Sequence, residues 1–123
     1  DQHMVPVFKN TSKNFFSLPN ELFFLNIGHG VITVYAYLLY CEDRRTHQCH
    51  PSYRTISDVV HLTVSTVMKH ITKLADRQFI TVESTSYIDK RGMKWNGNNL
   101  YTILPIQMAM DYCYQQQLLR LEA

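Results

Sequence analysis

Residues 61–70 read HLTVSTVMKH, and the fold depends on how this short stretch is built. Its Thr, Ser and Val residues favour a strand or a loop by propensity. The spacing of its apolar residues favours a helix instead, because positions three and four residues apart share one helical face. That face continues past the stretch and consists of Val64, Val67, Ile71 and Leu74. Thr63 stands where a hydroxyl can accept an orphan amide, so we predict a helix over 64–78 with Thr63 as its N-cap.

Two helices are predicted before this one. Residues 31–41 repeat apolar side chains at i, i+3, i+4 and i+7, which is typical of an amphipathic helix. The polar residues 42–50 are expected to form a loop. A short second helix is predicted between Pro51 and Val60, and it ends at a break just before the helix of the opening stretch.

Strands and a last helix are predicted after it. Residues 79–82 and 100–104 are rich in strand formers, and the polar segment 83–99 between them carries two Gly-containing turn signals. Pro105 can begin a last helix over about 106–121.

This order of elements predicts a mainly α fold with a small β-hairpin, a winged helix-turn-helix. Two short helices joined by a tight break form the helix-turn-helix, whose second helix enters the DNA major groove. The hairpin that follows has a basic tip, Asp89-Lys90-Arg91-Gly92-Met93-Lys94, which corresponds to the wing.

The recognition helix carries the side chains that such a role needs. Short hydroxyls near its start can read base edges, and longer cations can contact phosphates. The candidate base-reading residues are Thr63, Ser65 and Thr66, and the candidate phosphate contacts are Arg54, Lys69, His70, Lys73, Lys90, Arg91 and Lys94. The alternative is an ordinary surface helix, because periodicity identifies faces and not partners.

A family resemblance adds to this interpretation. PSYRTISDVVHLTVSTVMKHITKLADRQFI, residues 51–80, resembles the winged helix-turn-helix domains of bacteria and their mobile elements. Together with FFSLPNELF at 15–23 and VYAYLLY at 34–40, it is similar to the N-terminal domain of plasmid replication initiator A proteins and related Gram-positive helix-turn-helix proteins. The resemblance covers about 15–104 and implies double-stranded DNA as the partner. It departs from the family at His61, where the turn usually carries Gly.

Other motifs point to no metal, cofactor or catalytic activity. A Cys-x5-His-x-Cys-His pattern, Cys41 to His50, does not have the paired spacing of a structural zinc site, so we predict a polar loop there. The sequence has no Gly-rich phosphate loop and no catalytic signature. We therefore predict a DNA-binding protein that is not an enzyme and has no evident small-molecule ligand.

Length and composition agree with one small domain. The 123 residues divide into a flexible segment 1–14, a winged helix-turn-helix domain 15–104 and a C-terminal helix 105–123. The net charge of +2 is concentrated in the basic segment 51–94. Three cysteines at irregular spacing favour reduced thiols, and neither a membrane span nor a signal peptide is evident, so a cytoplasmic location is expected.

Two aromatic residues and the last helix leave structural alternatives open. Tyr35 is expected in the core. Trp95 is expected to anchor the wing to the body, because exposed Trp is uncommon, and the alternative is an exposed wedge. The last helix has one apolar stripe, followed by further leucines: Ile106, Ala109, Met110 and Cys113, then Leu118, Leu119 and Leu121. This helix packs on its own domain or on a second copy, which makes a homodimer a candidate assembly.

Three roles fit this fold. The leading one is sequence-specific binding of double-stranded DNA as a bacterial transcriptional regulator. The second, drawn from the resemblance, is the DNA-binding domain of a plasmid or mobile-element replication initiator. The third is a protein-interaction winged helix that does not bind DNA.

Overall fold

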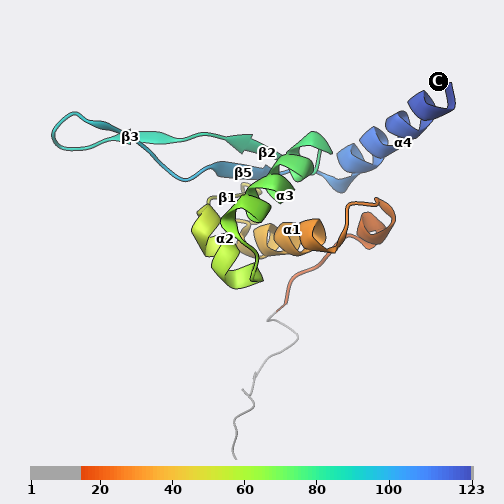
Figure 1. Ribbon diagram of the computed structural model, residues 1–123, viewed down its shortest axis with the longest axis horizontal. Helices are drawn as coiled ribbons and strands as arrows, with labels where there is room; N and C mark the ends of the chain where they lie inside the picture. The colour runs from red at the N-terminus through yellow and green to blue at the C-terminus, as the bar shows by residue number, and fades with distance from the viewer. Residues whose placement is uncertain (1–14, 123) are drawn as a thin grey trace, which may run out of the picture.

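The computed structural model describes residues 15–122, so the predicted flexible segment 1–14 lies outside the described residues. A body of helices and a small sheet carries two projections (Figure 1). The helical elements are the 3-10 helix η2 (Asn20–Phe24), α1 (His29–Cys41), α2 (Tyr53–Val60), α3 (Val64–Asp76) and α4 (Ile106–Glu122). The strands are β1 (Gln48–Cys49), β2 (Ile80–Glu83), β3 (Ser86–Ile88), β4 (Lys94–Asn96) and β5 (Leu100–Ile103).

The core lies where α1 crosses α3. The apolar face predicted for α3 is buried at Val67, Ile71 and Leu74, and α1 buries its own predicted face against it. Tyr35 is 1% exposed and meets Phe79 edge to face, with ring centroids 5.3 Å apart, so its predicted core position is confirmed. This burial holds α3 helical despite its poor helix formers, because tertiary packing outweighs propensity differences of a few tenths of a kcal/mol per residue.

Both helices of the helix-turn-helix begin with the same kind of cap. The hydroxyl of Ser52 accepts the amide of Thr55 at 3.1 Å, and that of Thr63 accepts the amide of Thr66 at 3.2 Å. The predicted N-cap is therefore confirmed. Between the two helices His61 adopts the left-handed conformation (φ 58°, ψ 40°) at the position where the family usually has Gly.

The sheet contains a strand that the sequence did not indicate. Residues 42–50 were expected to form a loop, but β1 pairs antiparallel with β5, which pairs in turn with β2. A strand of two residues is too short for a period-two pattern, and its partner lies about fifty residues later in the chain. Only the folded chain brings the two together.

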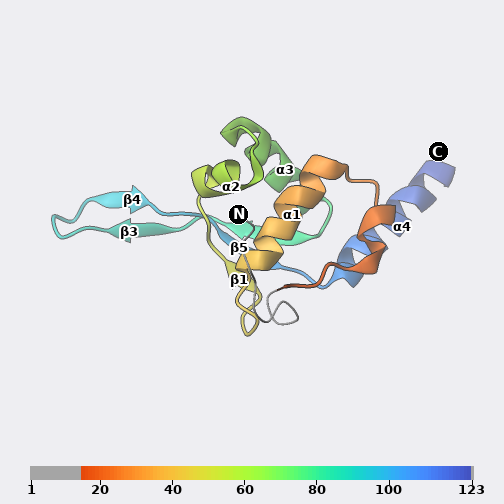
Figure 2. The ribbon, with the colours of Figure 1, turned by 90° about the horizontal axis from the view of Figure 1, so that it is seen from below.

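Two projections leave the body in opposite directions (Figures 1 and 2). One is the predicted hairpin, in which β3 and β4 pair as a separate two-stranded ribbon, here called the wing. The other is α4, whose predicted stripe packs on the body at its first half, with Ala109 buried and Ile106, Met110 and Cys113 partly buried. Its last turns carry exposed leucines. No helix within residues 15–122 is long and apolar enough to cross a membrane.

Candidate nucleic-acid interface

The outer face of α3 is the surface opposite the core. Ser65 and Lys69 are exposed there, as the sequence predicted, and Met68 and Thr72 complete a shallow surface with them. Met68 and Thr72 were not predicted as part of this surface, although the same three- and four-residue spacing that identified the buried face also defines its opposite. A helix in the major groove presents this outer stripe to the bases.

The hydroxyls at the start of α3 have structural partners of their own. Thr63 accepts the amide of Thr66 and donates to the Thr66 hydroxyl at 2.9 Å, while the hydroxyl of Ser65 lies 3.3 Å from that of Thr63. Ser65 is exposed and Thr66 is half-buried. Of the three predicted base-reading hydroxyls, Ser65 is therefore the one best placed to meet a base edge.

His70 and Lys73 lie toward α1 and not on the outer face. The Lys73 ammonium donates to the carbonyl oxygen of Ile27 at 3.1 Å, where the chain enters α1. The imidazole of His70 packs so closely on Gly30 that a Cβ there would lie 2.6 Å from Nε2. Burial, helped by the nearby Lys73 charge, lowers the pKa of His70, so its neutral form is favoured. Both side chains therefore contact the start of α1 and the residues before it, and not the outer face of α3.

The wing tip is organised by one carboxylate. Asp89 Oδ1 accepts the amides of Arg91 and Met93 at 2.9 and 3.0 Å, and Oδ2 accepts the indole Nε1–H of Trp95 at 2.9 Å. Gly92 has φ 83°, a conformation that favours glycine and closes the turn. These bonds satisfy the backbone amides of the turn within the wing, and the side chains of Lys90, Arg91 and Lys94 are all exposed around it.

Trp95 does not anchor the wing to the body. The side chain is 47% exposed and bonds within the wing, so the expected anchor is wrong and the exposed alternative holds. Tyr87, its cross-strand partner, is also exposed. The ribbon stands clear of the core, which leaves no buried surface for Trp95 to reach (Figure 1).

At the root of the wing the strand pairing is interrupted, and two side-chain hydrogen bonds hold the root to the body. Between the pair Glu83–Leu100 and the pair Ser86–Asn96, two residues on one strand face three on the other, which is a bulge. The amide of Asn99 donates to the Tyr53 hydroxyl at 2.8 Å, and that of Asn98 donates to the carbonyl oxygen of His50 at 3.1 Å. These two bonds fix the root of the wing to the start of α2.

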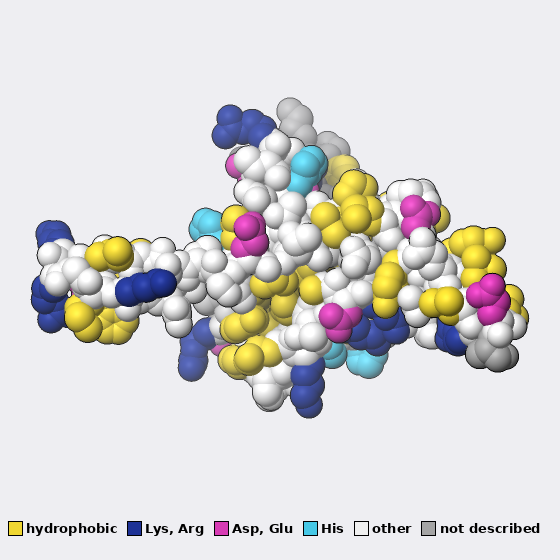
Figure 3. All heavy atoms as spheres, turned by 90° about the horizontal axis from the view of Figure 1, so that it is seen from above, with side chains coloured by type: hydrophobic (Ala, Val, Ile, Leu, Met, Phe, Trp, Pro, Cys, Tyr) yellow, Lys and Arg dark blue, Asp and Glu magenta, His cyan; other side chains and the backbone are white. Residues whose placement is uncertain are grey.

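Positive charge collects at the wing tip and on both helices of the helix-turn-helix. Figure 3 shows Lys and Arg side chains at the far end of the wing, beside hydrophobic side chains. Within residues 15–122, no carboxylate lies within 4.0 Å of Arg54, Lys69, Lys90 or Lys94. Arg91 is 3.6 Å from Asp89 in an exposed pair, which holds it only weakly. These cations come from α2, α3 and the wing.

The loop with the Cys-x5-His-x-Cys-His pattern brings no ligand set together. Cys49 is buried and its thiol donates to the carbonyl oxygen of Leu38, while His47 pairs with Glu42. Among the described residues, no three His, Cys, Asp or Glu side chains form a group that could hold a metal ion.

The fold is a winged helix-turn-helix, with the recognition helix, the wing and their order as predicted. Residues 25–80 match the family model described as a helix-turn-helix domain, which confirms the predicted resemblance to such domains over this part of the chain. Among solved structures, a possible transcriptional regulator from Methanosarcina mazei Go1 is similar, with a TM-score of 0.51 and 21% identity. The match covers 80% of this chain and 76% of that one, and at this identity it shows the fold alone. No curated protein matches.

Proposed function

We propose that this chain binds double-stranded DNA sequence-specifically and acts as a transcriptional regulator. The observation that carries the proposal is the outer face of α3, where Ser65, Lys69 and Thr72 lie on one exposed stripe. The Thr72 hydroxyl donates to the carbonyl oxygen of Met68 at 3.0 Å, so toward a base edge it acts as an acceptor. A groove-reading helix needs short donors and acceptors for base edges, and a cation beside them for the phosphates.

The remaining cations extend the contact beyond the major groove. Lys90, Arg91 and Lys94 stand at the wing tip, and Arg54 is exposed on α2. Phosphate contacts of this kind position a domain on the duplex and carry no sequence information by themselves. In this proposal α3 supplies specificity, and α2 and the wing supply most of the electrostatic affinity.

The proposal includes a non-enzymatic, cytoplasmic protein without a cofactor, with residues 15–104 as its DNA-binding unit. A homodimer formed through α4 would set the spacing of two half-sites. The structural relative, described as a possible transcriptional regulator, supports the fold on which this role depends.

The alternative within DNA binding is the DNA-binding domain of a plasmid or mobile-element replication initiator. It is favoured by the similarity of 15–23 and 34–40 to the replication initiator A proteins. The two roles differ in their genomic target: a regulator protects promoters, whereas an initiator protects its own origin. A winged helix that binds only protein is the third candidate.

The test begins with selection of bound duplexes from a random pool, followed by measurement of affinity for the selected site and for random DNA. Ser65→Ala and Thr72→Ala should each weaken binding to the selected site by about 1–3 kcal/mol and leave random DNA nearly unchanged. Thr81→Ala, at an exposed position on β2, is the matched control. If the chain binds DNA but the selection enriches no sequence, binding is not sequence-specific. If the chain does not bind DNA even at low salt, the protein-interaction role is favoured.

A further inference from the structure

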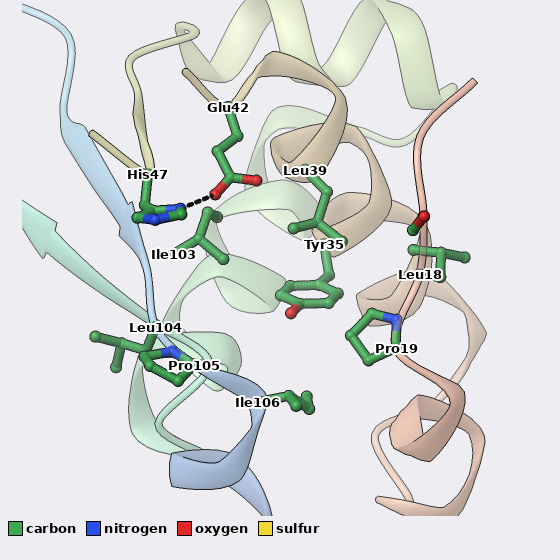
Figure 4. A pocket seen from close by; sticks show the side chains of 11 residues that line it. Leu18, Pro19, Tyr35, Leu39, Glu42, His47, Ile103, Leu104, Pro105 and Ile106 are labelled. Carbon is green, nitrogen blue, oxygen red and sulfur yellow. Dashed lines mark hydrogen bonds and ion pairs between the residues drawn. The ribbon is translucent and has the colours of Figure 1, made fainter. Parts of the chain in front are cut away.

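A groove separate from the helix-turn-helix opens where five segments meet. It has a volume of about 480 Å³ and is lined by the entry segment 17–19, the second half of α1, the loop that carries Glu42 and His47, the end of β5 and the start of α4. Its walls are mostly apolar, with Leu18, Leu39, Ile103 and Ile106 among them (Figure 4). This volume falls in the range of small-molecule sites.

Two polar groups stand in this apolar setting. The Glu42 side chain is only 10% exposed, and one of its oxygens, Oε2, lies 2.7 Å from Nδ1 of His47. Figure 4 shows the other oxygen pointing away from His47, on the side of Leu39. A carboxylate this buried is costly unless its lone pairs are satisfied, so its second oxygen is a place for a donor from outside the fold.

The second polar group is the hydroxyl of Tyr35 at the floor of the groove. Tyr35 is 1% exposed, and its hydroxyl has no hydrogen-bond partner among the described residues. Figure 4 shows it directed toward the side formed by Ile103 and Ile106. Burial, followed by the negative charge of Glu42, raises its pKa to about 12, so the hydroxyl stays neutral and can both donate and accept. Buried hydroxyls normally have partners, which makes this one an indication of a ligand.

We propose that this groove binds a small organic amine, in which a protonated amino group on an apolar body pairs with Glu42 and the Tyr35 hydroxyl completes the polar contact. The charge decides the class: a buried carboxylate attracts an ammonium and repels an anion. The apolar walls accept an aromatic or aliphatic body. The site lies apart from the proposed DNA contacts and does not depend on them.

The test uses the full ¹⁵N-labelled chain and three matched probes: 2-phenylethylamine, the neutral 2-phenylethanol and the anionic 3-phenylpropanoate. The amine should shift the amides around Tyr35, Glu42 and Ile103 in a saturable way, and the two other probes should bind about tenfold more weakly or not at all. Glu42→Gln should reduce amine affinity to that of the alcohol, and Tyr35→Phe should weaken it. Glu83→Gln, an exposed carboxylate change on β2, is the control and should leave amine binding unchanged.

Several results would overturn the proposal. The first is equal binding of all three probes, and the second is the absence of saturable shifts in the groove. If Glu42→Gln fails to fold, the comparison of amine and alcohol on the unaltered chain still decides the question. If the same amides shift with protein concentration alone, the groove binds a second copy of the chain. If the amine binds only after residues 1–14 are removed, the groove is occupied by the chain's own first segment.

Discussion

The indole Nε1–H of Trp95 donates to Oδ2 of Asp89 at 2.9 Å, so the return strand of the wing is bonded to the first residue of its turn. Together with the amides of Arg91 and Met93 on the other oxygen, this bond stabilises the charged form of the carboxylate. The pKa of Asp89 is therefore lowered, first by the Trp95 bond and then by the Met93 amide. The geometry of the tip thus depends on an ionised Asp89.

This bond predicts an acid transition of the wing tip. Because the folded pKa lies below the ordinary value of 3.8, the stabilisation of the tip is present above that value and is lost as the pH falls through the lowered pKa. Trp95 is the single tryptophan of the chain, so its fluorescence reports on the tip. The transition should have a midpoint below 3.8, and Asp89→Asn should abolish it. Asp111→Asn on α4 is the control, and a midpoint at or above 3.8 would contradict the prediction.

The two lysines of α3 should behave differently. Lys69→Ala should weaken specific and random DNA binding alike and reduce the log–log salt slope by about 0.9, because one phosphate contact is lost. Lys73→Ala should leave the slope unchanged and lower the free energy of unfolding by about 1 kcal/mol, since its ammonium bonds the Ile27 carbonyl. Salt titrations and urea melts of both variants provide the measurement. Equal loss of slope in both would place Lys73 on the DNA.

The wing tip should contribute affinity without specificity. Replacing Lys90, Arg91 and Lys94 together with Ala should weaken binding to selected and random DNA by a similar factor, with a slope reduction of up to about 0.9 per lost contact. The melting temperature should change little, because all three side chains are exposed and outside the core. The matched control is the double variant Arg44→Ala/Arg45→Ala, which removes two exposed cations from the loop after α1. This variant should leave the log–log salt slope of DNA binding unchanged. A triple variant that binds as tightly as the unaltered chain at every salt concentration would remove the wing from the interface.

The end of α4 should determine oligomeric state. Tyr114, Leu118 and Leu121 share one helical face and are all exposed, and such an apolar stripe suits packing against the same stripe of a second copy. Leu118→Glu should convert the dimer to a monomer in sedimentation experiments and weaken binding to a two-half-site duplex more than to a single half-site. Gln115→Glu, at another exposed position of α4, should do neither. A chain that is monomeric before the substitution would refute the dimer.

A glycine in the turn of the helix-turn-helix should make the protein more stable. His61 is held at φ 58°, which a side chain with a Cβ adopts at a cost of about 1 kcal/mol relative to Gly. His61→Gly should therefore raise the free energy of unfolding by about 0.5 kcal/mol, a gain reduced by the greater freedom of Gly in the unfolded chain. Asp58→Gly, inside α2, should lower it by about 0.3 kcal/mol, the difference in helix propensity between Asp and Gly. Equal destabilisation by both would mean that His61 makes a contact that outweighs its strained backbone.

Features that depend on a few neighbouring residues could be predicted from the sequence. The helix over 64–76, its Thr63 cap and the turn around Gly92 all follow from hydrogen bonds and side-chain spacing within one or two turns of chain. The end of α3 was predicted two residues too late, because the chain leaves the helix to place Phe79 and Ile80 in the core.

Features that join distant segments were decided only by the tertiary structure. Periodicity showed that Lys73 is off the buried face but could not show that the start of α1 supplies a carbonyl 46 residues away. The pairing of β1, the exposure of Trp95 and the presence of Glu42 and Tyr35 in one groove have the same origin. Local spacing determines which face a residue occupies, whereas the partner of that face is set by how the elements pack, which no short window of sequence contains.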